Sequence, residues 1–191
     1  MKKTVVTLIT TALFFWLSSP VITDSKTPAK GETLPGIKLL IPKNPGERNY
    51  LGLSDRGSFQ IPHVRAGVVI IEIFSLYCPH CQAFAPEVNI LYRMIEQVPD
   101  FRDKIKMIGI GAGNSFVEAE TFGKTYDVPF PLFPDEDFSI HKLLGEVRTP
   151  YFIVIKINRD RIHQIIYSKP GGFGEAEIFL QKILEDSGLK Q

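Results

Sequence analysis

The residues of this chain best suited to chemistry are its two cysteines, Cys78 and Cys81. They come where a run of β-branched residues, 68–74, gives way to apolar residues with helical spacing over 79–98. Cys78 is therefore predicted at the N-terminus of a helix, where unpaired N–H groups and the helix dipole favour a thiolate over a thiol. Cys81 lies one turn further along, close enough to form a disulfide with Cys78. The spacing predicts a redox pair, with Cys78 as nucleophile and Cys81 as resolving thiol.

The two residues between the cysteines fit this interpretation. Pro79 suits the first turn of a helix because its missing N–H would be unpaired there anyway. His80, when protonated, adds positive charge beside the thiolate, which stabilises the reduced form and makes the disulfide more oxidising. A structural disulfide would close too short a loop to gain much chain entropy. A metal site would need further ligands, and the spacing of the other histidines suggests none: His63, His141 and His163. We expect neither a cofactor nor a metal.

Glu72 is the one charged residue within the apolar run that precedes the cysteines. A lone carboxylate inside a buried strand should have a raised pKa, because burial penalises its charged form. Near Cys81 it could accept the proton of the resolving thiol, directly or through water. The alternative is that Glu72 hydrogen-bonds a neighbour or reaches solvent at the strand's edge, since Glu is seldom buried without a partner.

Predicted strands and helices alternate along the chain, and Ser115 with Glu118 forms a capping box at the start of one helix. Two short apolar stretches on either side of a turn cluster predict an N-terminal β-hairpin, Ile37–Ile41 and Asn49–Leu53. The other predicted strands are 68–74, 105–110, 151–157 and 162–167, and the predicted helices are 79–98, 115–126, 137–144 and 175–185. This order predicts an α/β sandwich with a mixed central sheet.

The amino-terminal segment has the pattern of an export signal. Lys2 and Lys3 precede an apolar run over 4–17, which is shorter than the roughly 20 residues that a membrane-spanning helix needs. Residues 1–19 are therefore predicted to be a signal peptide, 20–33 a linker and 34–191 the folded domain. The cleavage site is poorly marked, so an uncleaved membrane anchor is the alternative. We expect a periplasmic or otherwise exported protein.

Composition excludes several classes of protein. With 44% hydrophobic residues, the chain of 191 residues has ample apolar surface to bury, which excludes intrinsic disorder. A net charge of +1 argues against nucleic-acid binding through bulk charge. Two cysteines are too few for a disulfide-stapled scaffold or a four-cysteine zinc site. Near-neutral charge also predicts that partners are selected by a groove around Cys78 and Pro150 rather than by long-range steering.

The segment from Glu72 to Phe84 resembles the active-site segment of the thioredoxin superfamily, and its Cys-Pro-His-Cys is typical of the DsbA type. By this resemblance, Glu72 matches the buried acid of the superfamily and Pro86 matches the proline that kinks the active-site helix. Thr149 and Pro150 match the cis-proline loop, which faces the disulfide in this superfamily.

The layout of the chain is closer to the TlpA-like and redoxin branch. That branch has an N-terminal hairpin and one extra strand and helix between the cysteines and the cis-proline, which fits the long spacing between Cys81 and Pro150. The resemblance implies a thioredoxin-like three-layer sandwich, with helices on both faces of a mixed central sheet.

A cis Pro150 would hold the backbone of Thr149 where a substrate peptide could pair with it as an added strand. The alternative is an ordinary turn proline before a strand. The aromatic residues Phe74 and Tyr77 are interpreted as packing residues rather than recognition elements.

These observations predict an exported thiol–disulfide oxidoreductase that acts on protein thiols and disulfides and is served by a redox partner protein, with no nucleic-acid partner. One alternative is a thiol peroxidase, because Ser75-x-x-Cys78 half-matches the Thr-x-x-Cys of peroxiredoxins. Another is a non-catalytic binding module with the thioredoxin fold. The direction of electron flow stays open, since His80 favours an oxidant and the TlpA-like layout favours a reductant fed by a membrane donor.

Overall fold

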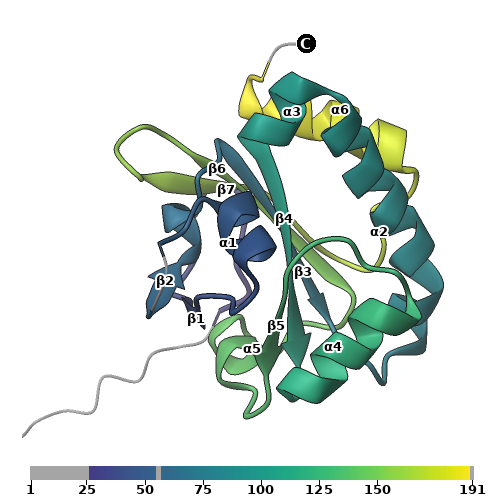
Figure 1. Ribbon diagram of the computed structural model, residues 1–191. Coiled ribbons are helices and arrows are strands. Elements are labelled where there is room, and N and C mark those ends of the chain that lie inside the picture. The colour runs from purple at the N-terminus through teal and green to yellow at the C-terminus, as the bar shows by residue number, and fades with distance from the viewer. Residues whose placement is uncertain (1–25, 55–56, 190–191) are drawn as a thin grey trace, which may run out of the picture.

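The computed structural model describes residues 26–54 and 57–189. The predicted signal peptide and the first part of the linker lie outside the described residues. The middle layer is a five-stranded sheet with the strand order β5-β4-β3-β6-β7 (Figure 1). Its strands are β3 (Val68–Phe74), β4 (Ile105–Ala112), β5 (Leu132–Asp135), β6 (Tyr151–Ile157) and β7 (His163–Pro170). Strands β3, β4 and β5 are parallel, whereas β6 and β7 are antiparallel to their neighbours, so the predicted mixed sheet is confirmed.

Helices lie on both faces of the sheet (Figure 1). One face carries α2 (Pro79–Gln97), α3 (Pro99–Lys104), α4 (Phe116–Thr125) and α6 (Ala176–Ser187). The other face carries α5 (Ser139–Leu143) and an N-terminal unit. Every residue of β3 is buried, because Val68 and Ile70 pack against the first layer and Ile71 packs against the second. A strand covered on both faces reads as a continuous apolar run, which is why the sequence predicts it so clearly.

The N-terminal unit contains two paired strands, but the second is not where the sequence predicts it. β1 (Lys38–Leu40) pairs antiparallel with β2 (Ser58–Gln60). Asn49–Leu53, the predicted second strand, lies instead in α1 (Pro45–Leu51) and its C-terminal cap, so that prediction was wrong. The residues that look like a turn are capping residues: the side chain of Asn44 accepts a hydrogen bond from the N–H of Gly46. A short 3-10 helix, η1 (Ile61–His63), follows β2.

Part of the predicted linker lies along β7. The N–H of Gly31 donates to the carbonyl of Ile165, and the N–H of Ile165 donates to the carbonyl of Glu32, each at 2.8 Å. The hydroxyl of Ser168 donates to the carbonyl of Pro28 at 2.5 Å. The two bonds of Ile165 satisfy backbone groups at the open edge of β7. Among the described residues, no helix is long and apolar enough to cross a membrane.

Tyr50 forms a hydrogen bond with the part of β4 that does not pair with β5. Strand β5 pairs with Gly109 to Ala112 only, so the first half of β4 has an unpaired outer edge. There the N–H of Met107 donates to the hydroxyl oxygen of Tyr50 at 2.8 Å, and the Lys106 ammonium lies 4.3 Å from the centre of the Tyr50 ring. Tyr50 belongs to α1, so this contact joins the N-terminal unit to the central sheet.

Replacing Tyr50 with Phe should therefore cost stability. It removes the hydroxyl and leaves the buried N–H of Met107 without a partner, which costs about 1–3 kcal/mol. The free energy of unfolding in urea measures the loss. The matched control is Tyr92→Phe, whose ring lies 6.1 Å from that of Tyr50 and which should change stability by less than about 0.5 kcal/mol. An unchanged free energy of unfolding in Tyr50→Phe would show that the ring, rather than the hydroxyl, closes this edge.

Candidate active site

Cys78 lies where β3 has ended and α2 begins. It is the N-cap residue of α2, with extended backbone angles, and Pro79 follows it in the first turn. The N–H of Cys81 donates to the Sγ of Cys78 at 3.2 Å, a contact of the kind that stabilises negative charge on sulfur. Cys78 is half-buried, so this residue is partly accessible from outside.

Cys81 is fully buried below Cys78. Burial raises the pKa of the Cys81 thiol well above its usual range, and a hydrogen bond with the side chain of Cys78 raises it further. Its neighbours are apolar, including Phe74 of β3 and Ala85 of α2. The two thiols therefore differ in access: Cys78 can meet a sulfur from outside, whereas Cys81 can meet only Cys78.

Glu72 lies in the central strand beneath the cysteines and is 2% exposed. Burial raises its pKa to about 8, and its negative charge contributes to the raised pKa of Cys81. No described residue forms a hydrogen bond with its Oε1. The alternative in which Glu72 reaches solvent at a strand edge was wrong, because β3 is the middle strand of the sheet. A buried carboxyl with a pKa near neutrality can take up or release a proton at physiological pH.

The loop between α5 and β6 faces the cysteines. The peptide bond between Thr149 and Pro150 is cis, so the alternative of an ordinary trans turn proline was wrong. The thiol of Cys78 donates to the carbonyl of Thr149 at 3.4 Å. The structure thus brings Cys78 and Thr149 together across a long stretch of sequence. His80 is exposed on the first turn of α2, beside the cysteines in sequence and free of hydrogen bonds to described side chains.

Asn114 forms hydrogen bonds with the loop before Cys78, a role that was not predicted from the sequence. Its side chain is fully buried; its Oδ1 accepts the N–H of Leu76 at 2.8 Å and its Nδ2 donates to the Oγ of Ser75 at 3.3 Å. Gln82 of α2 adds a bond from its Nε2 to the carbonyl of Leu76 at 2.7 Å. The available signal was a polar amide just after a buried parallel strand, at the sheet edge where functional groups gather.

The two aromatic residues near Cys78 differ in environment. Phe74 is fully buried, with its ring centre 4.4 Å from that of Phe122, which confirms the packing prediction. Tyr77 is 68% exposed, so the same prediction was wrong for it. The chain has left the sheet by this residue, and the Tyr77 hydroxyl bonds the carboxylate of Glu118 instead of entering the core.

In the described part of the chain, the remaining histidines form no hydrogen bond with either cysteine. The ring of His163 bonds the backbone of Leu34, that of His141 bonds the carbonyl of Val147, and His63 is exposed. Within residues 26–54 and 57–189, no group of three His, Cys, Asp or Glu side chains is arranged to hold a metal ion.

Comparisons with known proteins find likeness in structure rather than in sequence. No protein-family model matches the chain, and no curated protein matches it. A Chlorobium tepidum protein assigned as thiol:disulfide interchange protein DsbE superposes with a TM-score of 0.62 at 16% identity, covering 85% of this chain and 100% of its own. A secreted Mycobacterium tuberculosis disulfide oxidoreductase, homologous to E. coli DsbE, gives 0.51 at 15% identity, covering 68% of this chain and 90% of its own. A thioredoxin-like protein from Aeropyrum pernix gives 0.52 at 16% identity over 78% of this chain and 89% of its own. The chain therefore has the thioredoxin-like fold that the resemblance of its active-site segment implies.

The raised pKa of Glu72 makes a specific prediction about stability. The folded chain keeps a proton that the unfolded chain releases between pH 4.5 and about 8, so folding takes up a proton in this range. The free energy of unfolding of the wild type should therefore fall with rising pH, relative to Glu72→Gln, by up to about 1.4 kcal/mol per pH unit. Below pH 4.5 this difference should be constant.

Urea unfolding at several pH values across this range measures the difference. Glu177→Gln, on the exposed side of α6, is the control and should follow the wild type. Parallel pH profiles for wild type and Glu72→Gln would contradict the raised pKa.

Proposed function

We propose that this chain is an exported thiol–disulfide oxidoreductase that exchanges disulfides with protein cysteines through Cys78 and Cys81. The observation that carries the proposal is the placement of the two sulfurs. One is half-exposed at the start of α2 and faces the backbone of Thr149, while the other is buried one turn further in. This geometry supports a nucleophile with its own resolving partner.

In the first step the Cys78 thiolate attacks one sulfur of a protein disulfide. A disulfide forms between Cys78 and that sulfur, and the second sulfur of the target leaves as a thiolate. The N–H of Cys81 and the N-terminus of α2 stabilise charge on the Cys78 sulfur whenever it is the leaving group in the reverse reaction. The backbone at Thr149 and Pro150 can pair with the target backbone as an added strand.

In the second step Cys81 resolves this mixed disulfide. Its thiol loses a proton, its sulfur attacks the sulfur of Cys78, and the first target sulfur leaves as a thiolate. The target has then gained two electrons, and Cys78 and Cys81 form the disulfide. Because burial disfavours the Cys81 thiolate, a base is needed at this step, and the deprotonated Glu72 is the buried group placed to accept the proton. The reverse sequence oxidises a protein dithiol.

Two further parts of the proposal concern location and partners. Lys2, Lys3 and the apolar run over 4–17 support export, with 1–19 as signal peptide or membrane anchor, 20–33 as linker and 34–191 as the domain. A chain that cycles between dithiol and disulfide needs a redox partner protein to restore it, which a membrane tether would place within reach. Both cysteines belong to the active pair, so the domain folds without a structural disulfide.

Replacing each cysteine separately tests the two roles. Cys78→Ser should abolish exchange with a model protein disulfide, because it removes the only accessible sulfur of the pair. Cys81→Ser keeps the nucleophile but loses resolution, so it should accumulate the mixed disulfide through Cys78. Non-reducing gels and mass spectrometry detect both results. Exchange at the wild-type rate by Cys78→Ser, or rapid peroxide consumption by the wild type, would overturn the proposal.

His80 should set part of the reduction potential. Its replacement by Ala removes an imidazole that, when protonated, adds positive charge beside the reduced Cys78, so the disulfide should become less oxidising and the potential should fall by about 30 mV, or 1.4 kcal/mol. Equilibration with glutathione buffers measures the shift. His63→Ala is the control, because η1 lies before β3 and hence at the opposite edge of the sheet from Cys78. A rise in potential, or an equal fall in both variants, would contradict this role for His80.

A further inference from the structure

An apolar surface lies beside the reactive sulfur, on the side away from the cis-proline loop. It consists of three exposed side chains, Tyr77 at 68%, Phe116 at 61% and Val117 at 65% exposure. Tyr77 immediately precedes Cys78, whereas Phe116 and Val117 are the first two residues of α4. Monomeric proteins rarely gather exposed large apolar side chains unless the surface binds something.

The carboxylate of Glu118 links the two segments that carry this apolar surface. One oxygen of Glu118 bonds the hydroxyl of Tyr77, and the other accepts the N–H of Ser115 at 2.7 Å in the capping box of α4. Asn114, just before this helix, ties down Leu76, just before Tyr77. The loop that carries Cys78 and the first turn of α4 are therefore fixed relative to each other. In this arrangement all three apolar side chains are exposed.

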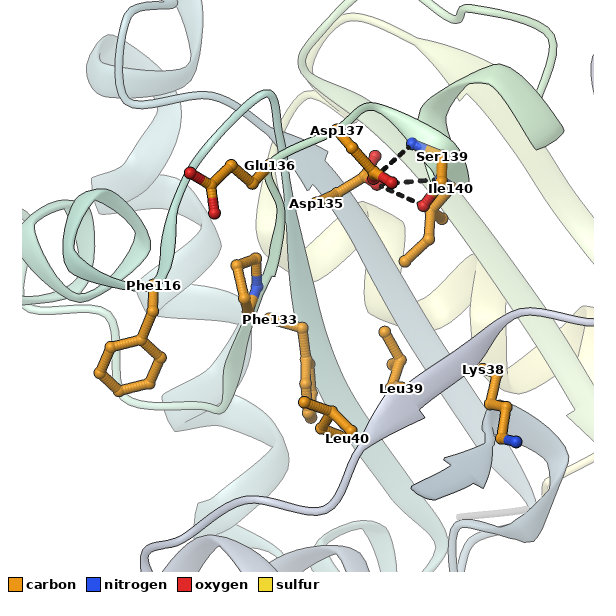
Figure 2. Close-up of a pocket in the computed structure, with 11 residues that line it drawn as sticks. Lys38, Leu39, Leu40, Phe116, Phe133, Asp135, Glu136, Asp137, Ser139 and Ile140 are labelled. Carbon is orange, nitrogen blue, oxygen red and sulfur yellow. Dashed lines mark hydrogen bonds between the residues drawn. The ribbon is translucent and has the colours of Figure 1, made fainter. Parts of the chain in front are cut away.

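Phe116, one of these three exposed side chains, also borders a cavity of about 460 Å³ (Figure 2). Strands β3, β4 and β5 are parallel, so their carboxyl ends, which lead to Cys78, Asn114 and this cavity, share one edge. Phe116 lines the cavity, together with Phe133 and Leu39. An elongated ligand lying along this edge can thus extend from the apolar surface into the cavity by way of Phe116, which belongs to both.

The charged groups around the cavity are mainly acidic. Its lining contains Asp135, Glu136 and Asp137 against one base, Lys38. The carboxylate of Asp135 accepts the N–H groups of Ile140 and His141. Glu136 and Asp137 are exposed at the rim, where the carboxylate of Asp137 also accepts the N–H of Ser139 and interacts electrostatically with Lys142. Figure 2 shows Glu136 on the side of Phe116 and Lys38 at the far side. The occupant should therefore be apolar with a positive charge.

We propose that this surface binds an extended segment of the target protein that carries an apolar side chain and a Lys or Arg close to its reacting cysteine. The inference rests on the proposed function, because a protein whose sulfur reaches Cys78 must lie on the neighbouring surface. The apolar side chain lies on Tyr77, Phe116 and Val117, and the cation lies at the acidic rim. The surface thus selects polypeptide substrates over small disulfides, which reach Cys78 without touching it.

Exchange with three disulfides tests this selection. Two are peptides of equal length, one with Phe and Lys beside its cysteine and one with Ser and Glu there, and the third is hydroxyethyl disulfide. The double variant Phe116→Ser, Val117→Ser should lower the kcat/KM for the Phe-Lys peptide, relative to hydroxyethyl disulfide, by about tenfold, the loss expected for one aromatic contact. The same ratio for the Ser-Glu peptide should not fall.

The control is Ile162→Ser. Ile162 is 64% exposed, like the altered residues, but it lies in the turn between β6 and β7, at the opposite edge of the sheet from Cys78. It should leave all three rates unchanged. An equal change of all three rates in the double variant, or no change in the ratio for the Phe-Lys peptide, would overturn the inference.

Binding without chemistry separates this inference from the proposed function. A fluorescent Phe-Lys peptide with serine in place of cysteine should bind the wild type, and the double variant should bind it about tenfold more weakly by anisotropy. If hydroxyethyl disulfide and both peptides fail to react with the wild type, the proposed function fails, yet this binding difference is still measured. Equal binding to both proteins refutes the surface whatever the exchange rates are.

Discussion

The hydrogen bond from the N–H of Cys81 to the sulfur of Cys78 is the contact on which the site depends. It exists because a strand buried on both faces ends where α2 begins, with Pro79 in the first turn. The rigid part is therefore the strand–helix junction, and the sulfur is held as an N-cap. The surrounding loops, those of Asn114 and Thr149, then fix what the sulfur can meet.

The two thiols differ in how deeply they are buried. Cys78 is at the surface, whereas Cys81 and Glu72 lie in an apolar layer where a charge is unfavourable. Placing an unpaired carboxyl in a central strand lowers the stability of the fold at neutral pH, because its proton must be kept. This cost in stability is not expected of a residue that serves packing alone, and it supports the proposed role of Glu72 in proton transfer.

The sequence predicts those elements that depend on residues near them in the chain. The run over 68–74, the helix after Cys78 and the capping box of Ser115 and Glu118 depend on neighbours in the chain, and the structure contains all three. The second strand of the N-terminal unit was misplaced because Asn44 and Pro45 signal a turn and the start of a helix equally well. Asn114 and Tyr77 were missed or misread because their partners, Leu76 and Glu118, lie about 40 residues away in sequence. Such pairings arise from the tertiary structure, which no local pattern encodes.

The central claim is that one junction presents Cys78 and protects Cys81. Alkylation of the reduced, full chain with limiting iodoacetamide, followed by peptide mapping, tests it most directly, because the reagent needs both a thiolate and access. The account predicts that Cys78 is modified first and that Cys81 reacts only after the protein is unfolded in urea. Modification of Cys81 at the same rate as Cys78, or before it, in the folded protein would contradict the account.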